Sequence, residues 1–239
     1  MEITDKVILL TGASGGLGSE MASYLNEQGY KLALHFNTHE VILPESETVQ
    51  HFQADLMDEI QIKAMIDAVV AVFGKIDVVI NNAGVSRNGI SWKLDSMDWD
   101  ESIAINLTAP FLITKYALPF MRKNGWGRVV NITSVVGQTG FVGTAAYAAS
   151  KSGLLGLTRT LSKEVASNGI TVNNLSLGYF NKGMIDEVSE ELQGEIIQTI
   201  PLKRLGEPKS IFAALDFVLS NEADFYTGQT LNLNGGMYT

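Results

Sequence analysis

Cysteine is absent from this sequence of 239 residues, and acidic residues outnumber basic ones by 26 to 17. Without cysteine the chain has no disulfide, no thiolate nucleophile and no cysteine metal site. The net charge of −9 argues against nucleic acid and anionic membranes as partners, because both bind clustered Lys and Arg. No stretch reaches the roughly 18 unbroken apolar residues of a membrane helix, and the N-terminus is acidic rather than basic. These absences predict a soluble, cytoplasmic protein with no metal centre.

Hydrophobic residues make up 46% of the chain, enough for the core of one domain, which we place at residues 1–239. Short Val/Ile/Leu-rich runs alternate with longer stretches of helical spacing. Unalternating apolar runs are typical of strands buried on both faces, so the pattern predicts an α/β fold with a doubly wound parallel sheet of about seven strands and helices on both faces. The predicted strands are 6–12, 31–36, 48–55, 76–84, 127–134, 170–178 and 229–236. The predicted helices are 16–29, 58–73, 98–123, 147–168 and 208–220, with Asp98 and Pro208 at helix starts.

Two connections between these elements are unusual. Only residues 38–47 join the second and third strands, and they contain Pro44. Because so short a helix is marginal and proline breaks its interior, we expect the crossover helix to be lost and the adjoining cleft to be open. Residues 180–207, rich in Glu and Gly, are the best candidate for a mobile loop or lid near a site.

A glycine-rich turn, "TGASGGLG" at residues 11–18, follows the first strand and opens a helix. Gly12, Gly16 and Gly18 permit a tight turn, close approach of backbone N–H groups to a pyrophosphate, and close packing of the helix on the strand. A lone glycine pattern also fits a plain strand-to-helix turn. In this strand–turn–helix context we interpret it as a dinucleotide-binding turn.

Tyr147 and Lys151 lie four residues apart in "AAYAASK". On a helix these positions share one face. Ionising a free tyrosine at pH 7 costs about 4 kcal/mol, and a cation about 4 Å away returns on the order of 4 kcal/mol at an effective dielectric near 20. The pair is therefore a candidate proton donor and acceptor. Considered without other motifs, a Tyr and Lys at this spacing also fit a simple packing role.

Together, "TGASGGLG", "NNAG" (81–84), Ser134 and "YAASK" resemble the short-chain dehydrogenase/reductase family, over nearly the whole chain. Within that family, "IPLKRLGEP" and "YTGQTLNLNGGMYT" are most similar to bacterial 3-oxoacyl-[acyl-carrier-protein] reductases, which implies a role in fatty acid biosynthesis.

The resemblance assigns roles to matching residues. It implies Tyr147 as catalytic acid/base, Lys151 as its partner, Ser134 as hydrogen-bond donor to the substrate oxygen, and Asn106 as holder of a water in a proton relay. It implies a cofactor site formed by the two catalytic residues Tyr147 and Lys151 with Gly12, Ser14, Gly15, Gly16, Leu17, Gly18, Phe36, Asn37, Asp55, Leu56, Asn82, Ala83, Gly84 and Gly178. His35, His39 and His51 have no such match, and we interpret them as ordinary strand and loop residues.

The second strand ends in Phe36, Asn37 and Thr38, with no carboxylate to repel a 2′-phosphate. This favours NADP(H) over NAD(H), although Gly15 and Thr38 stand where many relatives have arginine. After the sixth strand, Leu177 and Lys182 replace the proline and threonine of relatives, which puts the nicotinamide contacts in question.

The expected activity is NADPH-dependent reduction of a 3-oxoacyl thioester, carried by acyl carrier protein or CoA. An acidic carrier protein needs a basic patch, which Arg87, Arg122, Lys123 and Arg128 could form, although Gly125 and Asn168 replace arginines of relatives. The alternatives are a dehydrogenase of a small sugar, steroid or other secondary alcohol, and a catalytically weak nucleotide-binding or regulatory protein. The resemblance also implies a homotetramer with interfaces on helices 98–123 and 147–168.

Overall fold

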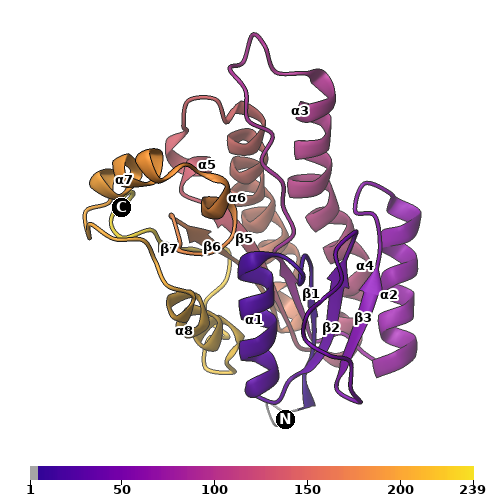
Figure 1. Cartoon of the computed structure of the whole chain (residues 1–239). Helices are drawn as coiled ribbons and strands as arrows, with labels where there is room; N and C mark the ends of the chain where they lie inside the picture. Colours follow the sequence, from indigo (N-terminus) through magenta and orange to yellow (C-terminus); the bar gives the residue numbers. More distant parts are fainter. Residues whose placement is uncertain (1–4) are drawn as a thin grey trace.

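Seven parallel strands form one sheet in the order β3-β2-β1-β4-β5-β6-β7 (Figure 1). The computed structural model describes residues 5–239 except for the side chain of residue 187; residues 1–4, part of the predicted domain, lie outside the described residues. The doubly wound α/β fold is confirmed. The strand order reverses between β1 and β4, which is where such sheets open a crevice for ligands. The strands are β1 (Val7–Leu10), β2 (Lys31–Phe36), β3 (Val49–Gln53), β4 (Val78–Asn81), β5 (Gly127–Ser134), β6 (Ile170–Leu177) and β7 (Thr230–Leu233).

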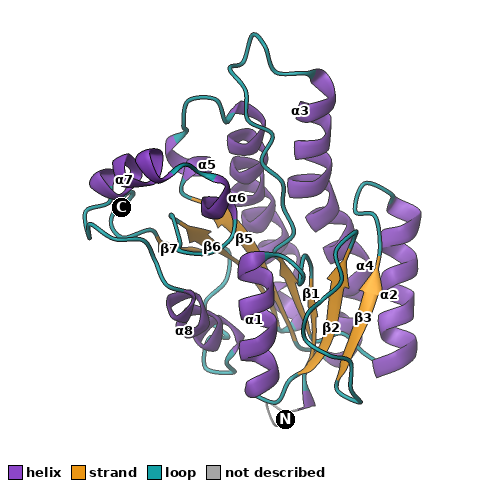
Figure 2. Ribbon diagram, viewed as in Figure 1, coloured by secondary structure: helices purple, strands orange, loops and turns teal. Residues whose placement is uncertain are grey.

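Helices cover both faces of the sheet (Figure 2). One apolar cluster joins the sheet to α1 (Gly16–Glu27) and α8 (Pro208–Leu219), and Pro208 begins its helix as predicted. A second cluster joins the opposite face to α2 (Glu59–Phe73), α4 (Ala109–Asn124) and α6 (Ala145–Val165). The strands are buried on both sides, which explains their unalternating apolar sequence. The remaining helices are α3 (Ser96–Ile103), α5 (Val136–Thr139) and α7 (Glu190–Thr199).

The predicted helix 98–123 is longer and less regular than expected. Asp95, not Asp98, caps α3, because its Oδ1 accepts the Met97 N–H at 2.8 Å; Asp98 lies in the first turn. A π-helical turn, Ala104–Thr108, then joins α3 to α4. The continuous helical stretch Ser96–Asn124 is long and apolar enough to cross a membrane by length and composition. Its buried α4 face, however, packs in the core of the domain through residues such as Ile113, so we assign it to the domain core.

Residues 37–48, between β2 and β3, contain no helix, as the sequence predicted. Val41 is buried and Leu43 packs beside it on the α1 side of the sheet, so an extended segment replaces the crossover helix. A cavity of about 310 Å³ lies between this segment and α1, lined in part by Ser19, Glu20 and Ile42. That the adjoining cleft is open stays a prediction.

Part of residues 180–207 forms regular secondary structure. They contain a 3₁₀ turn, Met184–Glu187, and the ten-residue helix α7. Ser189 caps α7 by accepting the Leu192 N–H, and Ile185 and Ile196 form the centre of a small apolar cluster of their own. The segment therefore contains regular structure that the sequence analysis did not assign, and its role as a mobile loop or lid stays a prediction.

Candidate active site

The glycine turn between β1 and α1 has the shape that the sequence predicted. Gly12 has φ +66°, a left-handed conformation that favours glycine. A Cβ on Gly18 would lie 2.0 Å from the Gly12 carbonyl oxygen, so helix α1 packs against the turn only because residue 18 has no side chain. These two glycines therefore fix the path of the backbone from the strand into the helix.

The first turn of α1 is open to an anion. Gly15 is its N-cap and provides no side-chain acceptor, and the first turn holds no acidic residue. By contrast, Asp58 and Asp95 cap α2 and α3. The leading N–H groups of α1 are thus left for another acceptor, and the positive end of the helix favours a phosphate. The turn fits the pyrophosphate of a dinucleotide.

The segment after β4 is tied to this turn. The Thr11 hydroxyl accepts the N–H groups of Asn82 and Ala83, both at 3.0 Å, while the Asn82 side chain donates to the Thr11 carbonyl at 2.9 Å. A Cβ on Gly12 would lie 2.9 Å from Ala83 Cα. The two predicted cofactor segments, 12–18 and 82–84, therefore form one surface.

The predicted adenosine contacts follow β2 and β3. Phe36 ends β2 and packs on the apolar cluster of the α1 face. Asp55 follows β3, and its Oδ1 already accepts the Met57 N–H at 2.9 Å. Leu56 is buried in the opposite core, so it can offer a cofactor only its backbone. All of these segments, with Asn37 and Ser14, lie at the carboxyl ends of strands, where a parallel sheet binds its ligands.

The predicted catalytic residues meet beside the same edge. Ser134 is the last residue of β5, and Tyr147 and Lys151 lie one turn apart at the start of α6. The Lys151 ammonium is buried, donates to the Ile132 carbonyl at 2.8 Å, and lies 5.7 Å from the centre of the Tyr147 ring. A Cβ on Gly84 would lie only 3.4 Å from Lys151 Nζ, so this glycine keeps space open beside the ammonium. With one of its three N–H groups used, Lys151 has donors left for a ligand.

Asn106 is fully buried in the π-helical turn and holds the loop after β4. Its Oδ1 accepts the Val85 N–H and its Nδ2 donates to the Val85 carbonyl, both at 2.8 Å. Nδ2 also donates to the Ser150 hydroxyl at 3.1 Å, and Ser150 donates to the Tyr147 carbonyl at 2.8 Å. The side chain therefore connects the loop to the helix turn that carries Tyr147.

The electrostatics differ from the sequence-based expectation. Burial raises the pKa of Tyr147, and a hydrogen bond with Ser134 acts in the opposite direction. Burial also lowers the pKa of Lys151 to about 8. The predicted lowering of the tyrosine pKa by Lys151 was therefore wrong, because burial dominates the shift and Lys151 is not among its causes. At neutral pH Tyr147 keeps its proton and Lys151 keeps its charge.

The segment after β6 closes over the glycine turn. A Cβ on Gly16 would lie 2.7 Å from Gly183 N, so the two backbones are in contact. Lys182 Nζ reaches to 3.8 Å from Glu20 on α1, which places this substitution beside the turn. Gly178 has a packing explanation, because a Cβ there would lie 2.7 Å from Asn234 Cα.

Comparison with known proteins agrees with this geometry. Residues 6–193 match the model of the short chain dehydrogenase family. The chain is 39% identical to the 3-oxoacyl-[acyl-carrier-protein] reductase FabG of Staphylococcus aureus, over 98% of each chain. It is 37% identical to FabG of Staphylococcus epidermidis, over 98% of this chain and 99% of the relative. It is 36% identical to nodulation protein G of Azospirillum brasilense, over the same shares. This chain belongs to the short-chain dehydrogenase family. The predicted family is confirmed, and the protein is an oxidoreductase that acts on CH–OH and C=O groups with NAD(P)H.

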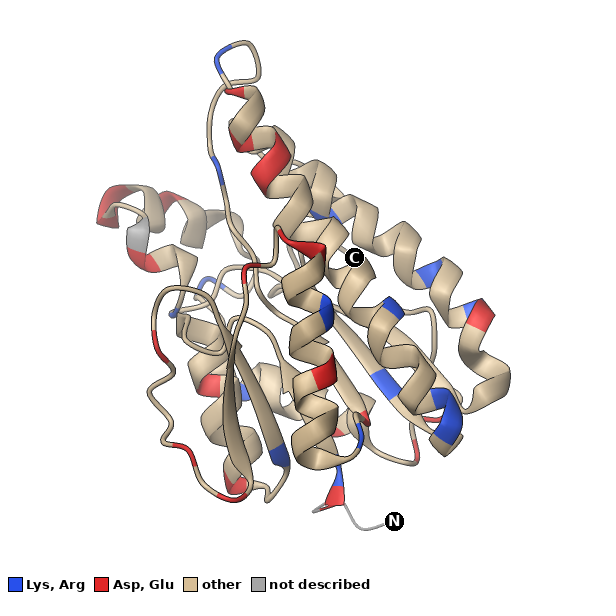
Figure 3. Ribbon diagram, turned by 90° about the vertical axis from the view of Figure 1, so that its right-hand side faces the viewer, with Lys and Arg blue, Asp and Glu red and all other residues tan. Residues whose placement is uncertain are grey.

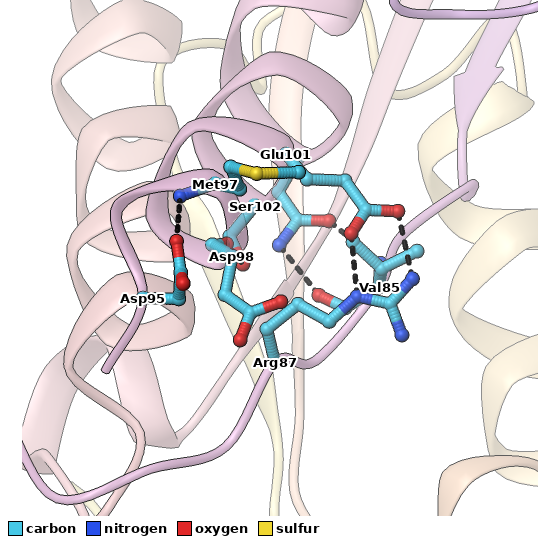
Figure 4. Close-up of polar contacts among 8 residues, drawn as sticks. Val85, Arg87, Asp95, Met97, Asp98, Glu101 and Ser102 are labelled. Atoms are coloured by element: carbon cyan, nitrogen blue, oxygen red, sulfur yellow. Dashed lines mark hydrogen bonds and ion pairs between the residues drawn. The ribbon is translucent and has the colours of Figure 1, made fainter. Parts of the chain in front are cut away.

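In this short-chain dehydrogenase the four cations suggested for carrier binding do not form one patch. Arg128 is 1% exposed; its guanidinium stacks on Trp126 at 4.4 Å and donates to the Ser220 carbonyl. Arg87 forms a two-bond ion pair with Glu101 of α3 (Figure 4). Arg122 and Lys123 lie at the far end of α4, about 30 Å along the helix from Glu101. Lys and Arg are also scattered over the face shown in Figure 3. The suggested basic patch was wrong.

The sequence interpretation of this dehydrogenase missed three positioning residues. Thr11 opens the quoted glycine-rich turn without a role of its own, although its place directly before Gly12 is a usable signal. Ser150 precedes Lys151 and was not considered. His35 was interpreted as an ordinary strand residue, yet both of its ring nitrogens bind backbone groups of the cofactor segments. The only sequence feature that could have indicated this role is a single histidine within an apolar strand.

Proposed function

We propose that this short-chain dehydrogenase is an NADPH-dependent carbonyl reductase that reduces a 3-oxoacyl thioester to the 3-hydroxyacyl thioester. The observation that carries the proposal is the placement of Ser134, Tyr147 and buried Lys151 beside an uncapped glycine turn. The names of the FabG relatives support the thioester as substrate.

The chain's own residues account for the proton. When bound, the nicotinamide supplies the hydride that reaches the carbonyl carbon. Tyr147, kept neutral by burial, donates its proton to the carbonyl oxygen, and the Ser134 hydroxyl donates a hydrogen bond to the same oxygen. The Lys151 ammonium stabilises the phenolate that remains. Asn106 Oδ1 and Lys151 Nζ both border the space beside Gly84, where a relay water would return the proton.

We favour NADPH because no carboxylate follows β2. Phe36 ends the strand, and the exposed residues Asn37 and Thr38 come next. Amide and hydroxyl groups can donate to a 2′-phosphate, whereas a carboxylate would repel it.

The positions of the basic residues bear on which carrier holds the acyl thioester. Arg128 is buried and Arg87 is paired with Glu101, so of the four suggested cations only Arg122 and Lys123 are exposed and unpaired with a described acid. The suggested set therefore offers an acidic carrier protein only two charges at one helix end. We therefore place acyl-CoA beside acyl carrier protein as the thioester carrier.

We also propose a cytoplasmic homotetramer that associates through α4 and α6, because Phe111 on α4 stays 42% exposed.

A direct test follows NADPH absorbance with acetoacetyl-CoA, an acetoacetyl carrier protein, and a panel of small ketones. The proposal expects the thioesters to have the highest kcat/KM. A preference for a small ketone would favour the alternative dehydrogenase. No turnover, with Tyr147→Phe binding cofactor as the parent does, would favour a nucleotide-binding protein.

A further inference from the structure

His35 is the penultimate residue of β2 and is 1% exposed. Its ring spans the two neighbouring strands. The Gly12 N–H donates to Nδ1 at 3.1 Å on the β1 side, and Nε2 lies 3.0 Å from the Ala54 carbonyl on the β3 side. Gly12 begins the glycine turn, and Ala54 directly precedes Asp55. One imidazole thus joins the pyrophosphate segment to the adenosine segment.

The partners of the ring determine its protonation state. A backbone N–H can only donate, so Nδ1 must accept and carry no proton. A carbonyl can only accept, so Nε2 must carry the proton. The arrangement therefore requires the neutral Nε2–H tautomer, and an imidazolium would point a second N–H at the Gly12 amide.

His35 also holds the next residue of the turn. The Ala13 N–H donates to the His35 carbonyl at 2.9 Å. With φ +66°, Gly12 directs its own N–H to the ring. Two consecutive amides at the start of the turn therefore depend on one residue, and a buried amide without an acceptor is costly.

We propose that the neutral imidazole of His35 is a positioning residue of the dinucleotide site, and that its protonation releases the glycine turn and weakens cofactor binding. The inference rests on nucleotide binding by this turn and not on the identity of the carbonyl substrate. His35 touches no reacting atom in this account.

The surroundings of the ring favour the neutral form. Burial lowers the pKa of His35, and the hydrogen bond to Ala54 raises it. The β1 turn, residues 11–13, carries no titratable side chain. The apolar cluster on the α2 face of the sheet includes Ala33 of β2 and Ile62 of α2. The charged or titratable side chains of β3, α2 and the residues between them are His51, Asp55, Asp58, Glu59, Lys63 and Asp67, and none of them contributes to the shift.

The test compares His35→Asn with His39→Asn and His51→Asn, which together cover the three histidines of the chain. Asparagine Oδ1 stands where Nδ1 stood and accepts the Gly12 N–H at every pH. The probe is NADH, which has no 2′-phosphate to titrate, and binding is measured by its fluorescence between about pH 6 and about pH 8.

In the parent protein, NADH affinity is expected to fall as pH is lowered from about 8 to about 6. The fall should be no more than about fourfold, because a histidine pKa below about 6.5 leaves at most about three quarters of the imidazole protonated at about pH 6. His35→Asn keeps an acceptor for the Gly12 N–H but is too short to replace the Nε2 bond to the Ala54 carbonyl, so its affinity at the upper end should be lower than that of the parent. Its affinity should nevertheless show no slope with pH, while the other two variants keep the parental slope. Persistence of the slope in His35→Asn, or its loss in His39→Asn or His51→Asn, would overturn the proposal.

NMR of the ligand-free protein provides a readout that is independent of binding. We expect His35 as the Nε2–H tautomer, protonating below its ordinary pKa near 6.5, with the Gly12 amide shift following the same midpoint. The proposal would be contradicted by an Nδ1–H tautomer of His35. It would also be contradicted if the chemical shift of the Gly12 amide did not change at the pH where His35 titrates. Failure to bind any nicotinamide nucleotide would contradict the proposed function. The common titration midpoint of His35 and the Gly12 amide would still show whether His35 controls the glycine turn.

Discussion

The Lys151 ammonium lies 5.7 Å from the centre of the Tyr147 ring and donates to the Ile132 carbonyl at 2.8 Å. The carbonyl on β5 thus fixes the lysine head against the strand that ends in Ser134. This anchoring places a buried cation beside the phenol. The charge is available when the phenol loses its proton.

The first prediction concerns the pH dependence of carbonyl reduction. Because burial lowers the pKa of Lys151 to about 8, its positive charge is present below that pH and is lost above it. The phenolate left by proton transfer then has no cation beside it, so kcat for reduction should fall as pH rises through about 8. Stopped-flow rates under saturating cofactor measure this limb. A flat profile up to pH 10, near the ordinary pKa of lysine, would contradict the assignment.

Gly18→Ala should abolish cofactor binding or folding. The added Cβ would lie 2.0 Å from the Gly12 carbonyl oxygen, so the turn must shift. Gly156→Ala in α6 is the matched control, because its Cβ would meet nothing within 4 Å. It should stabilise the protein by about 0.5–1 kcal/mol. Thermal unfolding and cofactor titration distinguish the two, and normal NADPH affinity in Gly18→Ala would refute the close packing.

Asn106→Ala should destabilise the fold as well as slow the reaction. The change leaves both Val85 backbone groups without the side chain that now binds them. Each buried group left unpaired costs about 1–3 kcal/mol. Ser150→Ala, which removes a single member of the same chain of hydrogen bonds, should cost less. Denaturant unfolding gives both values, and equal losses would mean that Val85 finds other partners.

Much of this architecture could be predicted from sequence because it depends on local patterns. The seven apolar runs became the seven strands, and Pro44 in a ten-residue connection correctly indicated the lost crossover helix. The glycine turn could also be predicted, because close backbone packing requires glycine there and the turn directly follows β1.

Other features depend on distant partners, which a sequence pattern does not contain. The π-helical turn at Asn106 is stabilised by contacts to Val85, and the buried position of Arg128 results from Trp126 and Ser220. The role of His35 arises only when β1 and β3 flank β2. The raised pKa of Tyr147 follows from burial, whereas the sequence argument counted only the charge of Lys151.

The choice of NADPH can be tested with one added carboxylate. Asn37→Asp places a negative charge directly after β2, where it would repel a 2′-phosphate and accept hydrogen bonds from ribose hydroxyls. NADPH affinity should fall about tenfold or more, with NADH affinity unchanged or improved. Titrations of both nucleotides with both proteins measure this. A parent protein that prefers NADH would overturn the cofactor proposal.

The central claim is that Tyr147 donates the proton in carbonyl reduction, and Tyr147→Phe tests it most directly. Phenylalanine keeps the ring and removes only the hydroxyl. We predict that kcat/KM for acetoacetyl-CoA falls at least about 100-fold, the scale of general acid catalysis, while the dissociation constant of NADPH stays the same. A variant that retains the parental rate would contradict the account.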